Sequence, residues 1–472
     1  MKETMTIIEV AAKWEVSSSM VSRMCREGKI LHAQKVNGQW MIPVDAVYPE
    51  RINKKGLIKK TRRNVLPLPI GVSDYRKAST EYYYVDKTLM IRDFLDEVPM
   101  VSLFTRPHRF GKTLNMDMLR TFFEKTEEDT SVYFKNRKIW ECGIEYTAEQ
   151  GKYPVVFISF KDVKCNTWTE TYDMLAKQIV LEYKRHAELC DESRNADVDY
   201  YLRVIHQQVT ENDLMVSLMM LTKMLHEYHG IEPIVIIDEY DIPIQQGHSS
   251  EFYDEVILFI RNLFSGAFKD NNHLKWGFLT GILRVGQGSI FNDLNNLKIF
   301  SILDHKFSEY FGFTPLEVRE MAAYYAVPAK YAEICEWYDG YRFGKSEIFN
   351  PWSVINYFSN DCIPRAFWLS TGSNDVIGEM LVVGDEEVYE RLYELKLGKS
   401  FVSSIDTSVI YPQIRQNPSS IYSFLLVSGY LKAEEIGISP SGDMMCNVSL
   451  PNKEIALVFD KEILAKLDIV AE

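Results

Sequence analysis

The spacing of apolar and polar residues divides the chain into an N-terminal head and a longer body that begins near residue 66. In the head, apolar residues recur at helical spacing over Thr6–Trp14, which predicts a short helix. A second helix is expected to run to about Glu27, because Ser17 or Ser18 can cap its start. Asn37-Gly38 stands between two strand-like runs and predicts a β-hairpin. Two short helices followed by a hairpin predict a winged helix-turn-helix.

In the body, short and nearly continuous apolar runs alternate with helical runs. The predicted strands are Met100–Phe104, Tyr153–Phe160, Pro233–Asp238, Leu274–Thr280 and Lys298–Leu303. The predicted helices include Thr113–Glu124, Thr171–His186, Asn212–His226 and Glu251–Phe264. Strands that are apolar along their whole length are typical of a parallel sheet covered by helices on both faces. We therefore expect an α/β fold.

After about residue 306 the strand-like runs become rare and helical segments dominate. The predicted organisation is a winged helix-turn-helix at 1–48, a basic linker at 49–65, an α/β domain at 66–305, a helical lid subdomain at 306–435 and a C-terminal tail at 436–472.

Composition and charge add a contrast between head and body. The chain of 472 residues is 46% hydrophobic and 25% charged, which is typical of globular proteins. Its net charge of −13 divides into +7 for residues 1–64 and −20 for the rest. A basic head on an acidic body points to a nucleic-acid partner for the head alone.

The cysteines and the apolar runs limit the location of the protein. Seven cysteines occur without a C-x-x-C pair, which argues against a disulfide framework or a zinc ribbon and favours reduced thiols in the cytoplasm. No apolar run reaches the roughly 18 residues of a membrane span, and the N-terminus lacks a signal-peptide core. We expect a cytoplasmic protein without a membrane partner.

The head resembles the excisionase/MerR-type DNA-binding domains over about 45 residues. The resemblance places double-stranded DNA against residues 1–64, with short polar and basic side chains turned toward bases and phosphates. The candidate DNA-binding residues are Ser18, Ser19, Ser22, Arg23 and Arg26 on the second helix and Lys35 and Gln39 on the wing. A protein-interaction module or a regulatory cap is the alternative. The basic linker is either a solvated tether or an arm that follows phosphates.

Three Gly-Lys-Ser/Thr triplets are candidate phosphate loops: Gly111-Lys112-Thr113, Gly344-Lys345-Ser346 and Gly398-Lys399-Ser400. Phosphate binding needs a strand, a loop of backbone N–H groups and the N-terminus of a helix. The first triplet has this context, because strand Met100–Phe104 precedes it and helix Leu114–Glu124 follows it. The other two triplets lack it, so we discard them.

The first triplet predicts a site for ATP and Mg²⁺. Lys112 is expected to reach the β- and γ-phosphates, and the hydroxyl of Thr113 to ligate Mg²⁺. Arg106 stands where the usual Walker A pattern has glycine, and with Arg109 it would add positive charge to the pocket. The candidate nucleotide-binding residues are Arg106, Pro107, His108, Arg109, Phe110, Gly111, Lys112, Thr113 and Leu114.

Two later strands supply candidates for the catalytic half of the site. Pro233–Asp238 is an apolar strand that ends in an acid, so Asp238 would hold Mg²⁺ through water and Glu239 would orient or deprotonate the attacking water. At the end of the next strand, Thr280 is the candidate sensor of the γ-phosphate, with Arg284 as a second one. A strand-end hydroxyl and a surface arginine are the alternatives for these two.

Several short sequence motifs of the body together resemble the predicted AAA-ATPase-like family over about residues 66–435. They are Tyr84–Thr88, Arg106–Thr113, Ile237–Asp241, Thr280–Arg284, Asn295–Leu297, Trp337–Phe343, Asn350–Ser353 and Ser370–Asn374. The resemblance implies a P-loop NTPase of the AAA type that binds and hydrolyses ATP, with Gly71–Thr88 near the adenine. The family's loop reads Arg-Pro-Arg-Arg-Phe-Gly-Lys-Ser, so Arg106 is a family trait, whereas His108 and Thr113 depart from the pattern.

The family often carries a PD-(D/E)XK nuclease after a segment that Pro451–Glu454 resembles. Since 18 residues follow Glu454, we expect no nuclease activity. The expected function is an ATPase switch with a DNA-binding head. A transcriptional regulator or scaffold with a non-hydrolysing nucleotide site, and a partner-dependent subunit of a mobile-element or defence system, are the alternatives.

Overall fold

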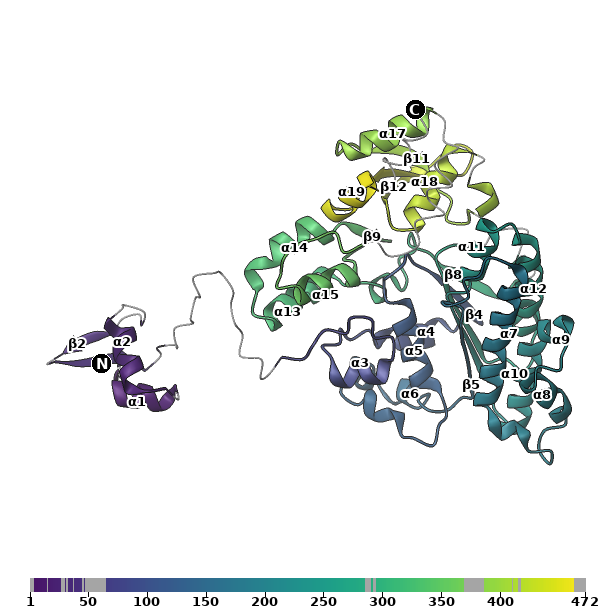
Figure 1. Cartoon of the computed structure of the whole chain (residues 1–472), viewed down its shortest axis with the longest axis horizontal. Coiled ribbons are helices and arrows are strands. Elements are labelled where there is room, and N and C mark those ends of the chain that lie inside the picture. The colour runs from purple at the N-terminus through teal and green to yellow at the C-terminus, as the bar shows by residue number, and fades with distance from the viewer. Residues whose placement is uncertain are drawn as a thin grey trace. The chain divides into compact units, whose positions relative to one another are not determined.

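The computed structural model describes residues 4–14, 16–26, 30, 33–36, 38–44, 46, 65–284, 290–291, 294–368, 386–409, 411–414 and 417–461 (Figure 1). It divides into two compact units, Met1–Val65 and Leu66–Glu472. Nearly all of the predicted linker lies outside the described residues, and so does the family motif Ser370–Asn374.

The smaller unit contains two helices and a three-stranded antiparallel sheet. Its elements are β1 (Thr4–Thr6), α1 (Ile7–Lys13), α2 (Ser18–Arg26), β2 (Gln34–Val36) and β3 (Gln39–Pro43), with the strands in the order β1-β3-β2. Thr6 and Glu9 form a capping box that fixes the start of α1. A small core of its own holds the unit together, formed by Val10, Ala11, Val21, Met24, Cys25, Ile30 and Ile42.

The centre of the larger unit is a five-stranded parallel sheet. Its strands are β4 (Val101–Thr105), β5 (Val155–Ser159), β6 (Ile234–Asp238), β7 (Trp276–Gly281) and β8 (Leu297–Phe300), in the order β5-β6-β7-β4-β8. Strands β4, β6 and β7 are buried along their whole length, which explains their continuous apolar runs. The predicted α/β class with a parallel sheet is therefore confirmed.

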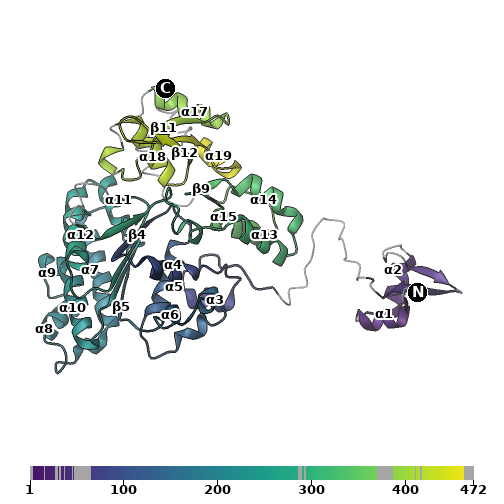
Figure 2. The same cartoon turned by 180° about the vertical axis from the view of Figure 1, so that it is seen from behind.

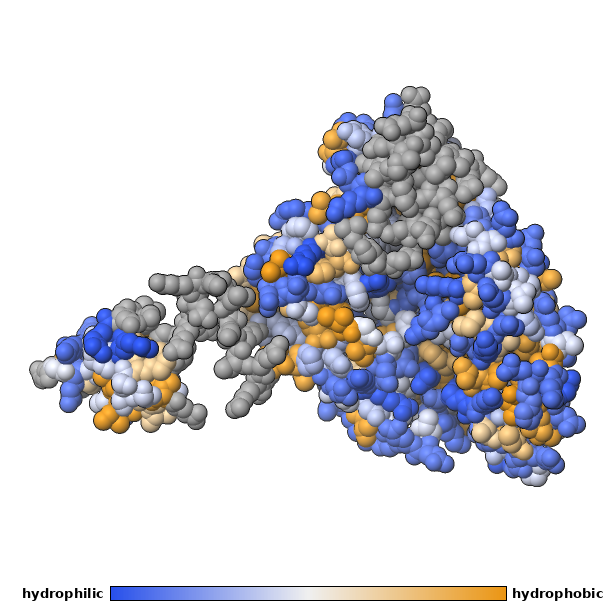
Figure 3. All heavy atoms as spheres, in the orientation of Figure 1, coloured by the Kyte–Doolittle hydropathy of each residue, from blue (hydrophilic) through white to orange (hydrophobic). Residues whose placement is uncertain are grey.

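Helices cover both faces of this sheet. In Figures 1 and 2, α4 (Leu89–Glu97) and α5 (Lys112–Phe123) lie on one side, and α7 (Trp168–Arg185), α10 (Ser217–His229) and α12 (Tyr253–Phe268) lie on the other. The surface in Figure 3 is largely hydrophilic, because these helices turn their apolar faces to the sheet. No helix in the described ranges has the length and apolar character that crossing a membrane requires.

The order of the strands decides where functional residues meet. Strand β7 lies between β4, which leads into the Gly-Lys-Thr triplet, and β6, which ends in Asp238. Because all five strands are parallel, their carboxyl ends lie at one edge. That edge is the place for a ligand site.

The region after residue 306 contains helices and also two further pieces of sheet. The helices are α13 (Pro315–Tyr324), α14 (Tyr331–Tyr338), α15 (Pro351–Ser359), α17 (Glu386–Lys396), α18 (Pro418–Val427) and α19 (Lys453–Phe459). Strands β9 (Tyr341–Phe343) and β10 (Ser346–Ile348) form a hairpin with Gly344 in its turn, so this triplet is not a phosphate loop.

The predicted boundary between a helical lid and a tail, at residues 435 and 436, does not coincide with the end of an element. It falls inside β12 (Lys432–Ile438), which pairs with β13 (Met444–Ser449), and β13 also pairs with β11 (Phe401–Ser404). The sequence pattern did not predict β12, because most of its side chains are exposed and it lacks the apolar run that marks a buried strand.

Candidate active site

The loop between β4 and α5 has the geometry of an anion-binding turn. Gly111 is the N-cap of α5 with φ of 82°, a left-handed conformation that glycine adopts without strain. A Cβ atom at this position would meet nothing within 4 Å, so the space over the helix start is open. The first N–H groups of α5 therefore face a place where an anion can approach.

Lys112 holds the loop in this shape. Its Nζ donates to the backbone carbonyl oxygens of Arg106 at 3.0 Å and Pro107 at 3.2 Å. It also lies 3.3 Å from Oε1 of Glu239, in an ion pair whose lysine side chain is 2% exposed. An ammonium group in this position is ready to exchange these partners for phosphate oxygens.

Asp238 is the centre of a cluster of hydroxyl groups at the carboxyl edge of the sheet. Its Oδ2 accepts from Thr113 at 2.8 Å and from Ser159 at 3.1 Å, and its Oδ1 accepts from Thr280 at 2.7 Å. The structure thus brings together residues from α5, β5, β6 and β7. Ser159 was missed, although it follows the apolar run of β5 in the way that Thr280 follows that of β7.

Glu239 is a buried carboxyl group with an unused acceptor. It has φ of 53°, and its backbone N–H donates to Oγ1 of Thr280 at 3.1 Å. Burial raises its pKa to about 7, against the opposing charge of Lys112. Its Oε2 atom is buried without a hydrogen-bond partner among the described residues, which is costly unless a ligand or water occupies the adjacent space.

Asp241 fixes the loop that follows β7. Its Oδ2 accepts from the backbone N–H groups of Ile282 at 2.7 Å and Leu283 at 3.0 Å. The predicted sensor Arg284 comes directly after these two residues, and no hydrogen bond in the described part of the chain joins it to Asp238 or Glu239. Thr280, in contrast, contacts both Asp238 and Glu239.

Arg106 does not supply the pocket charge that the sequence predicts. Its side chain is fully buried, and Nη1 donates to the carbonyl oxygens of Thr105 at 2.8 Å and Phe300 at 2.7 Å. Its guanidinium lies 4.9 Å from the centre of the Phe311 ring and 5.3 Å from that of Phe343. Arg106 therefore fastens the loop to β8 and to the region behind it.

The rest of the loop contacts the region after residue 306, which we call the C-terminal region. Phe110 lies between Tyr341 and Phe343, with ring centres 5.0 Å apart in each pair. His108 is neutral at pH 7, because burial and the nearby charge of Lys112 hold its pKa well below the usual value. The arginine that the family has at this position would carry a permanent charge, so this chain has one cation fewer at the loop.

A cavity of about 370 Å³ opens at the start of α5. The loop contributes Arg109, Phe110, Gly111, Lys112, Thr113 and Leu114 to its lining. Tyr83, Val85 and Trp352 line its apolar part, and Arg109 lies 4.0 Å from the centre of the Trp352 ring. This combination of cations, helix start and apolar surface suits a nucleotide. The sequence did not predict the contribution of Trp352.

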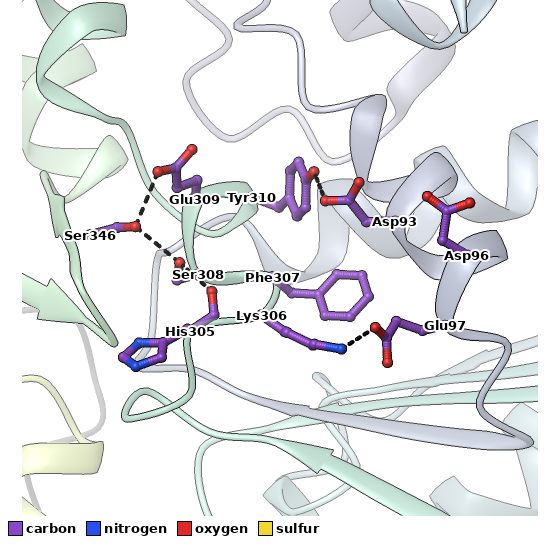
Figure 4. Close-up of a pocket in the computed structure, with 10 residues that line it drawn as sticks. All are labelled: Asp93, Asp96, Glu97, His305, Lys306, Phe307, Ser308, Glu309, Tyr310 and Ser346. Atoms are coloured by element: carbon purple, nitrogen blue, oxygen red, sulfur yellow. Dashed lines mark hydrogen bonds and ion pairs between the residues drawn. The ribbon is translucent and has the colours of Figure 1, made fainter. Parts of the chain in front are cut away.

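A second cleft of about 360 Å³ lies beside α4 (Figure 4). Its polar groups are engaged with each other: Tyr310 donates to Asp93, Lys306 pairs with Glu97, and Ser346 donates to Glu309 at 3.1 Å. It contains none of the predicted site residues, and we assign it no ligand.

The residues at the edge of the sheet fit Mg²⁺. A Mg²⁺ ion that binds with a nucleotide needs few protein ligands, because waters and phosphate oxygens fill most of its coordination sphere. The hydroxyl of Thr113 and the carboxylate of Asp238 lie within 2.8 Å of each other at the open start of α5. The described ranges contain no group of three or more His, Cys, Asp or Glu side chains that would form a closed metal centre.

Six of the candidate DNA-binding residues of the head are exposed. Val21, Met24 and Cys25 turn the apolar face of α2 into the core. The remaining positions of α2 and the hairpin carry Ser18, Ser19, Arg23, Arg26, Lys35 and Gln39, all exposed, and Ser22, half-buried.

Comparison with known proteins supports the resemblance seen in the sequence. Residues 69–291 match the model of the family described as predicted AAA-ATPase. An uncharacterized protein in the vnfD 5′ region of Azotobacter chroococcum mcd 1 is 25% identical over 320 residues, which are 66% of this chain and 56% of that protein. The chain thus spans little more than half the length of this relative.

A similarity to a solved structure is weak. The Aeropyrum pernix ORC1 protein, solved in complex with DNA, has a TM-score of 0.29 and 12% identity, over 84% of this chain and 97% of that chain. We infer neither fold nor function from it.

Proposed function

Since residues 69–291 form an AAA-ATPase-like module, we propose that the protein binds MgATP at the start of α5 and hydrolyses it. One observation carries the proposal. Lys112 and Thr113 of α5, Asp238 of β6 with the following Glu239, and Thr280 of β7 meet at the carboxyl edge of one parallel sheet, beside an open helix N-terminus.

Binding would begin with an exchange of partners at Lys112. The ammonium group now contacts two carbonyl oxygens and Glu239, and the β- and γ-phosphates would take the place of Glu239. The N–H groups at the start of α5 would hold the phosphates, and the apolar wall with Tyr83, Val85 and Trp352 would receive the base.

Thr113 and Asp238 would hold Mg²⁺, whose charge offsets that of the phosphates. The hydroxyl of Thr280 keeps the Asp238 carboxylate oriented and also fixes the backbone of Glu239. Thr280 therefore ties the two acids together, which suits a residue that responds to the γ-phosphate.

Glu239 is the candidate general base. Once Lys112 turns to the phosphates, the Glu239 carboxylate would accept the proton of a water molecule whose oxygen attacks the γ-phosphorus. The bond between the γ-phosphorus and the bridging oxygen breaks, and ADP and inorganic phosphate result. Burial raises the pKa of Glu239, which makes its carboxylate a stronger proton acceptor, and the unpartnered Oε2 is free to accept the proton.

Two substitutions test the proposal. Lys112→Ala should abolish ATP binding, whereas Glu239→Gln should keep binding and reduce turnover by at least about 100-fold. Lys345→Ala is the matched control, because Lys345 belongs to a Gly-Lys-Ser triplet in a hairpin turn. Tight ATP binding by the Lys112→Ala variant would refute the assignment. MgATP binding by wild type without turnover, alone or with DNA, would favour a regulator with a non-hydrolysing site.

We further propose that the head binds double-stranded DNA. The exposed face of α2 and the adjacent hairpin support this, because a helix that enters the major groove must present short polar and basic side chains. Residues 1–50 have equal numbers of acidic and basic residues, so the net positive charge of residues 1–64 comes from Arg51 onward. Removal of residues 1–64 should abolish DNA binding. For the full chain, affinity should fall steeply with salt concentration.

A further inference from the structure

We propose that Lys161 is a γ-phosphate-binding residue, a role that rests on the proposed ATP site. Lys161 lines the cavity at the start of α5 together with Lys112 and Glu239, and its side chain is exposed. It lies just beyond the end of β5, in the stretch that leads to α7.

The backbone places Lys161 on the Asp238 side of β5. Ser159 ends β5, pairs with Asp238 in the sheet and donates to its carboxylate. The N–H of Phe160 donates to the carbonyl oxygen of Asp238 at 2.9 Å, so the extended pairing continues by one residue. The N–H of Val163 donates to the carbonyl oxygen of Phe160 at 3.0 Å, so the chain turns at Lys161 and Asp162. Lys161 therefore lies in the turn directly after the residue that bonds to Asp238, whereas the Phe160 side chain is buried.

The charges around the cavity distinguish Lys161 from its neighbours. Lys112 pairs with Glu239, Lys87 pairs with Glu317 at 2.6 Å, and Arg109 lies over Trp352. Lys161 makes no hydrogen bond, ion pair or ring contact with any residue in the described part of the chain. It is the cation lining this cavity whose charge is not yet matched by a carboxylate or a ring.

An ammonium group that has no carboxylate partner, at the opening of a phosphate site, can bind the outermost phosphate. The α- and β-phosphates lie over the start of α5 in a phosphate loop of this kind, and the γ-phosphate extends toward the acids at the edge of the sheet. Lys161 lies in the turn that follows β5, the strand that pairs with the Asp238 strand β6. We therefore expect it to favour ATP over ADP and to stabilise the charge that builds up on the γ-phosphate oxygens during transfer.

The experiment compares Lys161→Ala, Lys161→Arg and Lys177→Ala with wild type. Lys177 is exposed on α7 and does not line the cavity, so it controls for the loss of a surface charge. The first measurement is the ratio of the dissociation constants of ADP and ATPγS, each with Mg²⁺. The second is the split between kcat and KM for ATP.

Lys161→Ala should lower the preference for ATPγS over ADP by about tenfold and kcat by about 10- to 100-fold, with little change in ADP affinity. Lys161→Arg should restore most of both effects, and Lys177→Ala should resemble wild type. If Lys161→Ala left kcat and the ratio of the ADP and ATPγS dissociation constants unchanged, the role of Lys161 would be overturned. The proposed ATP site would still stand in that case, provided that wild type binds ATP. Equal loss of ADP and ATPγS binding would also overturn the role of Lys161. Absence of nucleotide binding in wild type would overturn both.

Discussion

The buried carboxyl group of Glu239 makes the stability of the body depend on pH in a direction that one substitution tests. Burial raises its pKa from 4.5 to about 7, and the neighbouring Lys112 ammonium opposes that rise. The folded state therefore holds this proton more tightly than the unfolded chain does. The stabilising contribution is fully present below pH 4.5 and is lost as the pH rises through about 7.

The magnitude follows from the two pKa values. With about 1.4 kcal/mol per pKa unit, a rise from pH 5.5 to pH 8 should cost about 2 kcal/mol of folding free energy through this group. Glu239→Gln removes the titrating proton and nearly preserves the shape of the side chain. The variant should therefore lose about 2 kcal/mol less stability than wild type over the same pH range.

Urea unfolding without nucleotide, followed by tryptophan fluorescence at both pH values, measures this difference. Comparing two proteins at the same pH cancels the titration of all other groups. Glu232→Gln is the control, because this half-buried glutamate precedes β6 at the opposite end of the strand. If wild type and Glu239→Gln lost equal stability between pH 5.5 and pH 8, the assigned burial of the charge would be refuted.

Three further substitutions test other parts of the site. Gly111→Ala should lower the free energy of unfolding by about 1–2 kcal/mol in urea, because φ is 82° and the surrounding space is open, so the cost is backbone strain alone. Thr113→Val should remove the Mg²⁺ dependence of ATP affinity in a magnesium titration, and Thr113→Ser should retain it. Arg106→Lys keeps a charge but loses the guanidinium Nη1 that donates to two carbonyl oxygens, so it should cost about 1.5–3 kcal/mol in urea unfolding. An unchanged urea midpoint in Arg106→Lys, or in Gly111→Ala, would contradict these contacts.

The sequence could predict the parts of the site that depend on local pattern. A strand, a loop with Gly111 and a helix follow one another directly, and the strand before Asp238 is apolar throughout. These features need no knowledge of distant residues. Once the sheet is parallel, the edge at which they meet is also determined, and Thr280 at the end of β7 bonds to Asp238 at this edge.

The remaining features depend on contacts between distant parts of the chain. The charge of Arg106 suggested a pocket residue, but its partners include the carbonyl oxygen of Phe300, which is 194 residues away. Trp352 comes from α15, far along the chain from the loop that it contacts. Strand β12 lacks an apolar run because it is largely exposed. Local periodicity contains none of this information, because packing partners decide these orientations.

The distant contacts have a consequence for how ATP would act on the molecule. The loop is fixed from two directions: Arg106 bonds to the carbonyl oxygen of Phe300 at the end of β8, and Phe110 lies between Tyr341 and Phe343 of the C-terminal region. Trp352, from the same region, lines the cavity and stacks with Arg109.

A nucleotide would then contact both the sheet domain and the C-terminal region through one loop. A ligand shifts an equilibrium between arrangements only if it binds them with different affinity. Here the same cavity wall contains residues from both regions, so any change in their arrangement alters the nucleotide contacts. By reciprocity, bound MgATP would favour the arrangement in which Trp352 and the loop both reach it. Its phosphates would contact the acids at the edge of the sheet, and its base would contact Trp352 of α15. Hydrolysis would therefore weaken the link at its phosphate end first, which is how a bound nucleotide can act as a switch between the two regions.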